Sequence, residues 1–367
     1  MKFVCSSVDL IDAVLKVVKA VSSKSVNPIL ECIKLCAKGD YLTLSATDLE
    51  ISIEKKINAD VMLEGEILVP GKYFADFIGK INDESVEFTL KEDNRLKIKY
   101  LSSEGFIQTL NAEDFPIIEI GTEDNYLELK QGDLRDLVTK TIFSAATDDI
   151  RPILKGCYLE TEGDSVVGVC VDGYRLAVCK KPIVSKKEEL SLIVPTRALA
   201  EISRFMEKDE EQIVRLVLNK KTLAVEISNT LIVSRLIEGN FINYKGMISA
   251  ESNTDIVINK KNLENAIDRA GVLIRADKVT TIKFDINDNN LNLTANSEIG
   301  NIDENINIQT TGKDIKIAFN SKYVLDCLKA VDDEFIKIKF NNSSSPCIIK
   351  GIENDSYLYL ILPIRVA

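Results

Sequence analysis

Three basic residues recur along the chain at one fixed spacing. Lys72, Arg197 and Lys322 are separated by 197 − 72 = 125 and 322 − 197 = 125 residues. The pattern around each predicts the first turn of a helix, where the helix dipole disfavours a cation by about 0.3–1 kcal/mol. For a single lysine, a solvated helix face explains such a position well. Because the unfavourable position is used three times, we expect an anionic partner, and the phosphates of a nucleic acid duplex are the candidate.

Few residues of the chain are suited to catalysis. None of the 367 residues is a histidine, so the commonest general acid–base and the commonest metal ligand are missing. Residues 172–177, DGYRLA, place Asp172 and Arg175 in one predicted loop. A single Asp–Arg pair is more often structural, and no nucleophile and base accompany it. Since no glycine-rich phosphate loop occurs either, we predict a protein without catalytic activity and without a cofactor.

The composition narrows the class of protein. Hydrophobic residues make up 45% of the chain and charged residues 28%, which is ordinary for a globular protein. The net charge of -11 argues against a protein that coats nucleic acid over its whole surface, but it allows a basic stripe on an acidic body. No apolar run approaches the roughly 20 residues of a membrane span, and the N-terminus does not resemble a signal peptide. A cytoplasmic protein is predicted.

The eight cysteines lie mostly inside apolar runs. There is no C-x-x-C pair, and nothing completes a zinc site around Cys32 and Cys36, the closest pair. Buried, reduced thiols are therefore predicted, and no metal.

The elements that must position the recurring cations form an internal repeat. One segment with helical periodicity keeps its apolar face in all three copies except at Ser203. Pro70 and Pro195 are predicted in the first turn of their helices, and Asn320 at a helix cap. The copies begin at residues 69, 194 and 319 and read VPGKYFADFIGKI, VPTRALAEISRFM and FNSKYVLDCLKAV.

A second amphipathic helix opens each repeat. Between the helices, and again after the second one, the hydrophobic period changes to 2, which predicts strands. Each repeat therefore consists of helix, strands, helix and strands, and the fold class is α+β with three tandem similar domains at 1–124, 125–250 and 251–367. The apolar stripes of the opening helices are Leu10, Ala13, Val14 and Val17; Leu134, Leu137 and Val138; and Leu263, Ala266, Ile267 and Ala270.

Five short motifs occur in a fixed order along these repeats. They are KSVNPIL at 24–30, ATDLE at 46–50, DGYRLA at 172–177, FNSKY at 319–323 and LPIR at 362–365. With this order and spacing, the chain resembles from end to end the β subunits of bacterial DNA polymerase III, the β sliding clamps. The resemblance implies the DNA-clamp fold, in which each domain has two helices backed by β-sheet. It also implies that two subunits pair head-to-tail into a six-domain ring.

The resemblance implies a non-catalytic processivity factor and names its partners. The ring is expected to encircle double-stranded DNA without reading its sequence. It is expected to tether the replicative DNA polymerase, the clamp loader and repair proteins through a short linear peptide motif. Many helical lysines and arginines, Lys140 among them, are candidates for the inner surface of the ring. The cations assigned to DNA binding are Lys24, Lys72, Arg197, Arg204 and Lys322.

The same resemblance implies a hydrophobic peptide-binding groove in the second and third domains. The ending YLYLILPIRVA supports it, because a last strand docked in its own sheet explains Leu358 but not Pro363 beyond the strand. Val171 and Ser249 replace a threonine and a proline common in the family, which affects partner preference rather than the existence of the groove. The groove residues are Leu154, Val171, Gly173, Tyr174, Arg175, Leu176, Ser249, Leu360, Leu362, Pro363, Ile364 and Arg365.

The subunit interface has the weakest signal. Phe106 and Ile107 on a predicted edge strand, and Val272 and Leu273 at a helix end, are its candidates, although core packing explains them equally well. A clamp-like protein that has lost its ring and acts as a monomeric peptide-binding scaffold is the remaining alternative. Size in solution and retention on circular DNA separate the two hypotheses.

Overall fold

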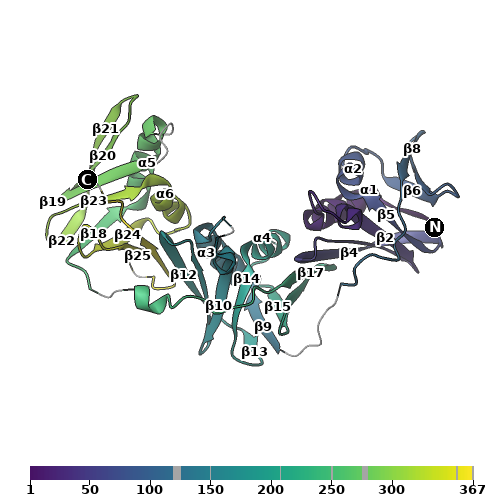
Figure 1. Cartoon of the computed structure of the whole chain (residues 1–367), viewed down its shortest axis with the longest axis horizontal. Helices are drawn as coiled ribbons and strands as arrows, with labels where there is room; N and C mark the ends of the chain where they lie inside the picture. The colour runs from purple at the N-terminus through teal and green to yellow at the C-terminus, as the bar shows by residue number, and fades with distance from the viewer. Residues whose placement is uncertain are drawn as a thin grey trace. The chain divides into compact units, whose positions relative to one another are not determined.

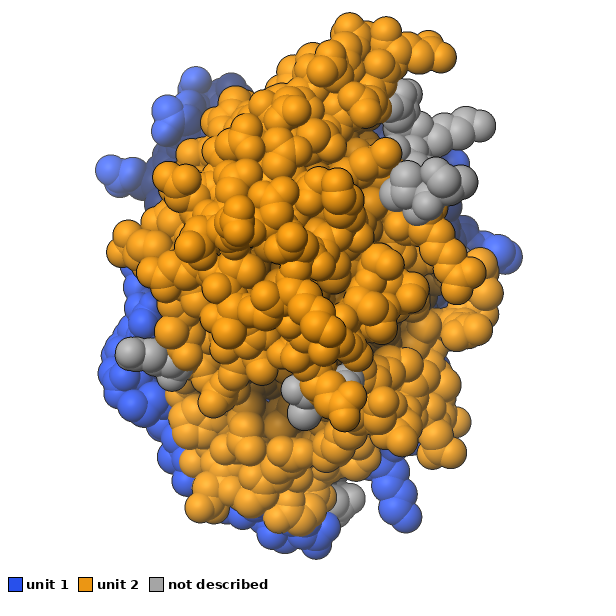
Figure 2. Space-filling view, turned by 90° about the vertical axis from the view of Figure 1, so that its left-hand side faces the viewer, with its two compact units in different colours: residues 1–131, 184–188, 197–236 blue, residues 132–183, 189–196, 237–367 orange. Residues whose placement is uncertain are grey.

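The computed structural model describes residues 1–118, 125–148, 150–206, 208–248, 251–274, 280–352 and 354–365. The chain divides into two compact units, blue and orange in Figure 2. Unit 1 comprises Met1–Gln131, Val184–Glu188 and Arg197–Leu236, and unit 2 comprises Gly132–Ile183, Glu189–Thr196 and Ile237–Ala367. Within the described ranges, no helix has the length and apolar character that a membrane crossing requires.

Unit 1 is built around one antiparallel sheet (Figure 1). Its helices are α1 (Ser7–Val17), α2 (Gly71–Ile78) and α4 (Thr196–Phe205), with the 3-10 turns η1 (Val18–Ala20) and η2 (Pro28–Glu31). Its strands are β1 (Lys2–Ser6), β2 (Cys32–Lys38), β3 (Tyr41–Thr47), β4 (Ile51–Leu63), β5 (Gly65–Pro70), β6 (Ser85–Leu90), β7 (Arg95–Tyr100), β8 (Ser103–Gln108), β9 (Asn125–Lys130), β13 (Ser185–Lys186), β15 (Ile213–Leu218), β16 (Thr222–Ile227) and β17 (Thr230–Arg235). They follow the order β13-β9-β15-β16-β17-β4-β1-β6-β7-β8, with β3, β2 and β5 branching from β4.

Unit 2 holds two sheets. Its helices are α3 (Gln131–Thr141), α5 (Lys260–Ile274) and α6 (Ser321–Lys329), with η3 (Ile142–Ser144), η4 (Pro152–Lys155) and η5 (Lys245–Met247). Its strands are β10 (Gly156–Glu162), β11 (Ser165–Val171), β12 (Arg175–Pro182), β14 (Ser191–Pro195), β18 (Thr254–Asn259), β19 (Thr281–Asn287), β20 (Asn290–Asn296), β21 (Asn301–Asn307), β22 (Gln309–Gly312), β23 (Ile315–Asn320), β24 (Phe335–Phe340), β25 (Cys347–Gly351) and β26 (Tyr357–Ile361). One sheet has the order β14-β10-β11-β12-β26-β25-β24-β18-β22 and the other β21-β20-β19-β23.

The amphipathic helices are confirmed, because every residue of their three predicted apolar stripes is buried. The first helix shows why it starts where it does. Ser6 caps α1, accepting a hydrogen bond from the Asp9 N–H at 3.4 Å, and the acidic Asp9 suits the positive end of the helix dipole. In the first and third repeats the two helices pack on each other, α1 against α2 and α5 against α6.

The helices that carry the recurring cations all begin at the same place. Pro70 and Pro195 were predicted inside the first turn; both instead lie one residue earlier, at the cap position that Asn320 occupies in the third copy. A proline there still ends the preceding strand and lacks an N–H that the helix could not have bonded. Asn320 caps α6 directly, since its Oδ1 accepts a hydrogen bond from the Lys322 N–H at 3.0 Å.

The three α+β repeats are joined by strand pairing across their limits. β4 of the first repeat pairs with β17 of the second, and β12 of the second pairs with β26 of the third. Each unit therefore combines strands from two neighbouring repeats, and the middle repeat contributes to both units. The domain limits near residues 124 and 250 adjoin residues outside the described ranges and stay predictions.

Candidate functional site

Four predicted groove residues lie in one hydrophobic cluster of unit 2. Leu154 comes from η4, Val171 from β11, Leu176 from β12 and Leu360 from β26, and all four are buried. Strand register brings them together, because Leu176 pairs with both Val171 and Leu360 in neighbouring strands. The sequence prediction did not include several aromatic and aliphatic residues that complete the cluster, although most of them lie close together between residues 241 and 248. These additional members include Tyr158, Phe241, Ile242, Tyr244 and Ile248.

A tight turn between β11 and β12 presents one exposed aromatic side chain beside this cluster. Asp172 Oδ1 accepts hydrogen bonds from the N–H groups of Tyr174 at 2.9 Å and Arg175 at 3.0 Å. Gly173 has φ +92°, a conformation that other residues rarely adopt, so glycine is required here by the backbone rather than by space. The turn leaves Tyr174 61% exposed, with its ring stacked 6.0 Å from that of Tyr323.

Arg175 lies beneath the turn and not on an open surface. Its guanidinium donates to Asp172 Oδ2 at 3.0 Å, Asp326 Oδ2 at 2.6 Å and the Phe143 carbonyl at 2.6 Å. It also lies 4.6 Å from the ring centre of Tyr323. Burial by itself would lower the pKa of Arg175, but the two aspartates outweigh burial and raise it. Arg175 therefore holds the turn to α6 and η3, which makes it a positioning residue.

The C-terminal segment continues past the last strand along the edge of the cluster. The Leu362 N–H donates to the Tyr174 carbonyl at 2.8 Å, and the Ile364 N–H donates to the Ala318 carbonyl at 2.8 Å. Leu362 remains 39% exposed, Pro363 and Ile364 are half-buried, and Arg365 is exposed. The segment thus offers apolar side chains beside Tyr174. Ser249, also assigned to the groove, lies outside the described residues.

The recurring cations occupy equivalent positions, but their environments differ. Lys72, Arg197 and Lys322 are each the second residue of a helix and all are exposed. Arg197 already has partners within unit 1: it pairs with the carboxylate of Asp48 and donates to the Lys19 carbonyl at 2.9 Å. Only Lys72 and Lys322 of the trio therefore remain exposed without such partners among the described residues. The prediction that all three residues lie at helix starts is confirmed. They are not equivalent in their contacts, because Arg197 is paired within unit 1.

Two further assigned cations are exposed as well. Arg204, near the end of α4, is 64% exposed although it pairs with Glu201 at 2.5 Å. Lys24 lies in the exposed segment before η2. Both side chains are accessible to an anion in solvent, but no contact in the structure orients either of them toward an anion.

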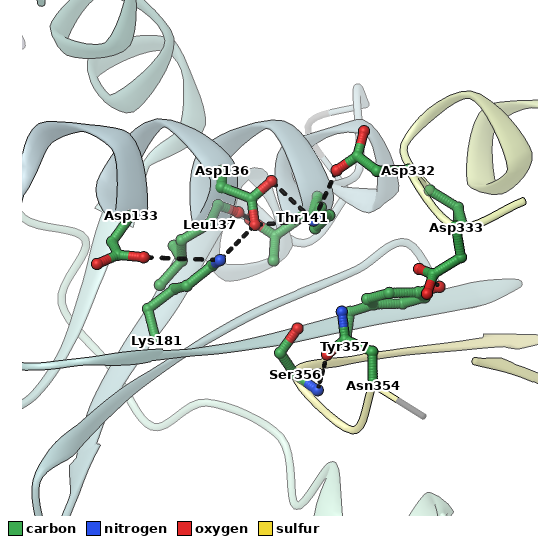
Figure 3. A network of polar contacts seen from close by, with 12 residues as sticks. Asp133, Asp136, Leu137, Thr141, Lys181, Asp332, Asp333, Asn354, Ser356 and Tyr357 are labelled. Carbon is green, nitrogen blue, oxygen red and sulfur yellow. Dashed lines mark hydrogen bonds and ion pairs between the residues drawn. The ribbon is translucent and has the colours of Figure 1, made fainter. Parts of the chain in front are cut away.

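Lys140 does not belong with the exposed helical cations. Its side chain is only 7% exposed, and its Nζ lies 2.8 Å from Asp136 and 3.0 Å from Asp332. Asp136 also forms an ion pair with Lys181 at 2.5 Å, and the neighbouring Tyr357 hydroxyl donates a hydrogen bond to Asp333 at 2.6 Å (Figure 3). Periodicity identified Lys140 as helical, but only tertiary contacts show that it joins α3 to the loop after α6.

Replacing Asp136 with asparagine is expected to destabilise the protein by about 2–3 kcal/mol at pH 7, because the buried Lys140 loses its best partner. Burial would raise the pKa of Asp136, but hydrogen bonds from Lys140 and Lys181 outweigh it and lower the pKa below the ordinary value. A lowered folded-state pKa means that the contribution is complete above the unfolded pKa of about 3.9 and is lost as the pH falls through the folded value. In urea unfolding, the difference from the unaltered chain should therefore shrink below about pH 4.

The control for this prediction is Asp355→Asn, which removes an aspartate that is 86% exposed. It should change the free energy of unfolding by less than about 0.5 kcal/mol at any pH. A cost for Asp136→Asn that is the same at pH 3 and pH 7 would contradict the ionic explanation.

One edge strand and one helix end expose the candidates for a subunit interface. β8 is the last strand of its sheet, and Phe106 on it is 46% exposed beside the guanidinium of Arg95 at 5.1 Å. Ile107 is half-buried on the same strand. In unit 2, Val272 is 61% exposed near the end of α5, next to the half-buried Leu273. β21, which ends the four-stranded sheet, is another edge strand, and the sequence did not reveal it.

The described residues offer little chemistry for a metal or a nucleophile. In these ranges, no group of three or more Cys, Asp or Glu side chains could hold a metal ion. All eight cysteines are free. Burial raises the pKa of Cys179 and of Cys347 to about 12, so these thiols stay protonated near neutral pH. Asp172 is occupied by the turn and by Arg175.

Comparison with known proteins accounts for the whole chain. Three models of the DNA polymerase III beta subunit match in sequence order: its N-terminal domain at residues 1–119, its central domain at 128–243 and its C-terminal domain at 245–365. The beta sliding clamp of Halalkalibacterium halodurans is 32% identical over 379 residues, covering 100% of both chains. That of Bacillus subtilis is 29% identical over 377 residues with the same coverage.

Solved structures agree with these relatives. The DNA polymerase sliding clamp from Bacillus subtilis superposes with a TM-score of 0.95 at 28% identity, covering 100% of each chain. A putative DNA polymerase III beta subunit from Eubacterium rectale gives 0.95 at 32% identity, again over 100% of both. A sliding clamp from Pseudomonas aeruginosa bound to griselimycin gives 0.92 at 26% identity with full coverage of both chains.

Proposed function

Because the chain belongs to the DNA polymerase III beta subunit family, the bacterial sliding clamps, we propose that it closes as a homodimer around duplex DNA and tethers replication and repair proteins to it. It is a processivity factor of the polymerase, and it has no catalytic activity of its own. The hydrophobic cluster of unit 2, flanked by the exposed Tyr174 and Leu362, carries the tethering part of the proposal.

The cluster suits a short apolar peptide motif from the replicative polymerase, the clamp loader or repair proteins. Four secondary-structure elements supply its floor, so its shape is fixed before a partner arrives. Tyr174 and Leu362 supply exposed apolar area, and the hydrogen bond between their main chains sets their spacing. A preformed apolar site of this kind binds a side chain or two tightly and leaves the rest of the partner free to move.

Contacts to DNA should be loose and independent of sequence, since a clamp must slide. Exposed cations such as Lys72 and Lys322 supply attraction to phosphate, while the net charge of -11 keeps the protein as a whole from adhering to nucleic acid. Encirclement then replaces affinity as the means of staying on the template. Arg197 contributes less, because Asp48 already neutralises it.

Changing both Lys72 and Lys322 to glutamate is expected to reduce loading onto nicked circular DNA about tenfold or more, because each reversal places a carboxylate where phosphate is expected. The amount of labelled protein that co-elutes with the plasmid on gel filtration measures the effect. A matched control, Lys220→Glu with Lys313→Glu, makes the same change in net charge at exposed positions outside helices and should load normally. Equal loading by both double variants would remove these two lysines from the DNA contact.

Ring closure is expected to depend on Phe106, Ile107, Val272 and Leu273. The double change Phe106→Asp and Val272→Asp should convert a two-chain particle into a single chain at micromolar concentration, because it replaces two exposed apolar side chains with carboxylates. Light scattering coupled to gel filtration gives the mass. Ile117→Asp, at a residue that is 88% exposed, is the control and should remain two chains. If the unaltered chain has the mass of one chain, a monomeric peptide-binding scaffold replaces the ring.

A further inference from the structure

The segment that leaves each repeat passes the same strand in the same way. In every copy, a residue of this connector bonds through its backbone N–H to the carbonyl of the strand that precedes the second helix. The strand residues are 193 − 68 = 125 and 318 − 193 = 125 positions apart, and the connector residues 237 − 110 = 127 and 364 − 237 = 127. The pairs are Leu110 with Leu68, Ile237 with Ile193 and Ile364 with Ala318, at 2.9, 2.9 and 2.8 Å.

In the first two repeats, the connector goes on to place an aromatic ring on the sheet. The ring contacts a residue of the neighbouring strand, namely the one paired with the strand residue that is hydrogen-bonded to the connector. In the first repeat this residue is Lys34, whose Nζ lies 5.8 Å from the ring centre of the buried Phe115. In the second it is Tyr158, whose ring stacks on Phe241 with 5.0 Å between centres. The chain thus covers the same face twice with the same kind of side chain.

In the third repeat, the described residues leave the corresponding face hollow. Lys283 of β19 is the residue that faces Ala318, and it is exposed. A cavity of about 830 Å³ lies over this part of β19, β20 and β23, which are neighbours in one sheet (Figure 1). Its lining includes Lys283, Thr294, Ala318, Ile364 and Arg365.

We propose that this cavity binds an extended segment of a partner protein that carries an aromatic side chain next to an acidic residue. The segment in the first repeat indicates this chemistry, because Phe115 directly follows Glu113 and Asp114. The third site has the matching charge: Asp285 in its lining is paired with Lys316 at 2.5 Å, which leaves the exposed Lys283 and Arg365 for a partner's carboxylate. A lysine beside an aromatic face gains a cation–π contact, as Lys34 does while its Nζ also pairs with a carboxylate, that of Glu66, at 2.7 Å.

The cavity is separate from the hydrophobic cluster proposed to hold the apolar peptide motif. It shares only Ile364 and Arg365 with the predicted groove residues, and its floor is the polar face of the four-stranded sheet. A partner anchored in the groove could extend over this second site, which would lengthen the contact without a second binding protein. The proposal does not require groove binding and can be tested without it.

A suitable probe is the chain's own connector, the fluorescent peptide LNAEDFPI with the sequence of residues 110–117, titrated into the full chain while fluorescence anisotropy is measured. We expect saturable binding with a Kd below about 1 mM, and binding about tenfold weaker or worse when alanine replaces the phenylalanine of the peptide. Two protein variants should each weaken binding at least about tenfold: Lys283→Glu reverses the charge, and Thr294→Trp fills the space. The matched control Lys313→Glu, an exposed lysine outside the cavity, should bind as the unaltered chain does.

Four results would overturn the proposal. The first three are no saturable binding, binding that Lys283→Glu and Thr294→Trp both leave unchanged, and binding that is lost in Leu362→Asp alone, since that last result would place the peptide in the groove. Tighter binding after removal of Val366 and Ala367 would also overturn it, because the chain's own terminus would then be the occupant. Normal DNA loading by Lys283→Glu is expected in every case, so failure here is distinguishable from failure of the clamp function.

Discussion

Replacing Leu362 with aspartate is expected to weaken binding of the polymerase's linear peptide motif about 100-fold or more, with little effect on folding. The side chain is 39% exposed beside the hydrophobic cluster, while its backbone N–H is held by the Tyr174 carbonyl at 2.8 Å whatever the side chain is. A partner that docks there must desolvate the new carboxylate without pairing it, which costs about 3 kcal/mol or more. Isothermal titration with a peptide from the polymerase's clamp-contacting segment measures the change.

The matched control is Ile352→Asp, which puts the same charge on another exposed aliphatic residue of unit 2 outside the cluster. It should leave peptide affinity within about twofold. Both variants should unfold at the same urea concentration as the unaltered chain, within error. If Leu362→Asp keeps full affinity, the peptide does not cover this segment and the groove must be placed elsewhere.

Replacing Arg175 with leucine is expected to lower the free energy of unfolding of unit 2 by about 3–5 kcal/mol, because it leaves Asp172 and Asp326 without their shared partner. The guanidinium is 7% exposed and joins a turn, a 3-10 helix and α6 through three hydrogen bonds. Urea unfolding followed by tyrosine fluorescence is the measurement. Peptide binding should weaken too, since the turn that presents Tyr174 loses its support.

Lys180→Leu is the control, because Lys180 lies on the same strand, is 47% exposed and pairs only loosely with Glu162 at 3.4 Å. It should change stability by less than about 0.5 kcal/mol. A small cost for Arg175→Leu, similar to that of Lys180→Leu, would contradict the positioning role and return Arg175 to the set of residues that could contact the peptide directly.

The helices and the threefold repeat could be predicted because their signals are short in range. The stripe Leu10, Ala13, Val14 and Val17 is buried as its spacing requires, and the position of Lys72, Arg197 and Lys322 at helix starts follows from the same local pattern. Such features depend on residues within a few turns of one another, so a linear pattern contains them. The apolar members of the groove were found through a family resemblance, and strand register then explained their meeting.

Side-chain partners could not be predicted, because they depend on which strands and loops meet. Arg197 is neutralised by Asp48, 149 residues away in the sequence, and Lys140 is buried against Asp332 rather than exposed on its helix. Arg175, assigned to the peptide surface, is instead occupied by three groups from separate elements. Each of these outcomes follows from a contact that no local periodicity encodes.

The sequence by itself determined the class of this protein: three α+β repeats, helices that begin with a cation, no histidine and an apolar ending. The tertiary structure alone decided which cations remain available, that the connector recurs against Leu68, Ile193 and Ala318, and that the third copy of that site is a cavity. The physical reason is the range of the interactions. Hydrophobic periodicity is set by neighbouring residues, whereas burial, ion pairing and cavity shape are set by segments that meet only after the sheets have formed.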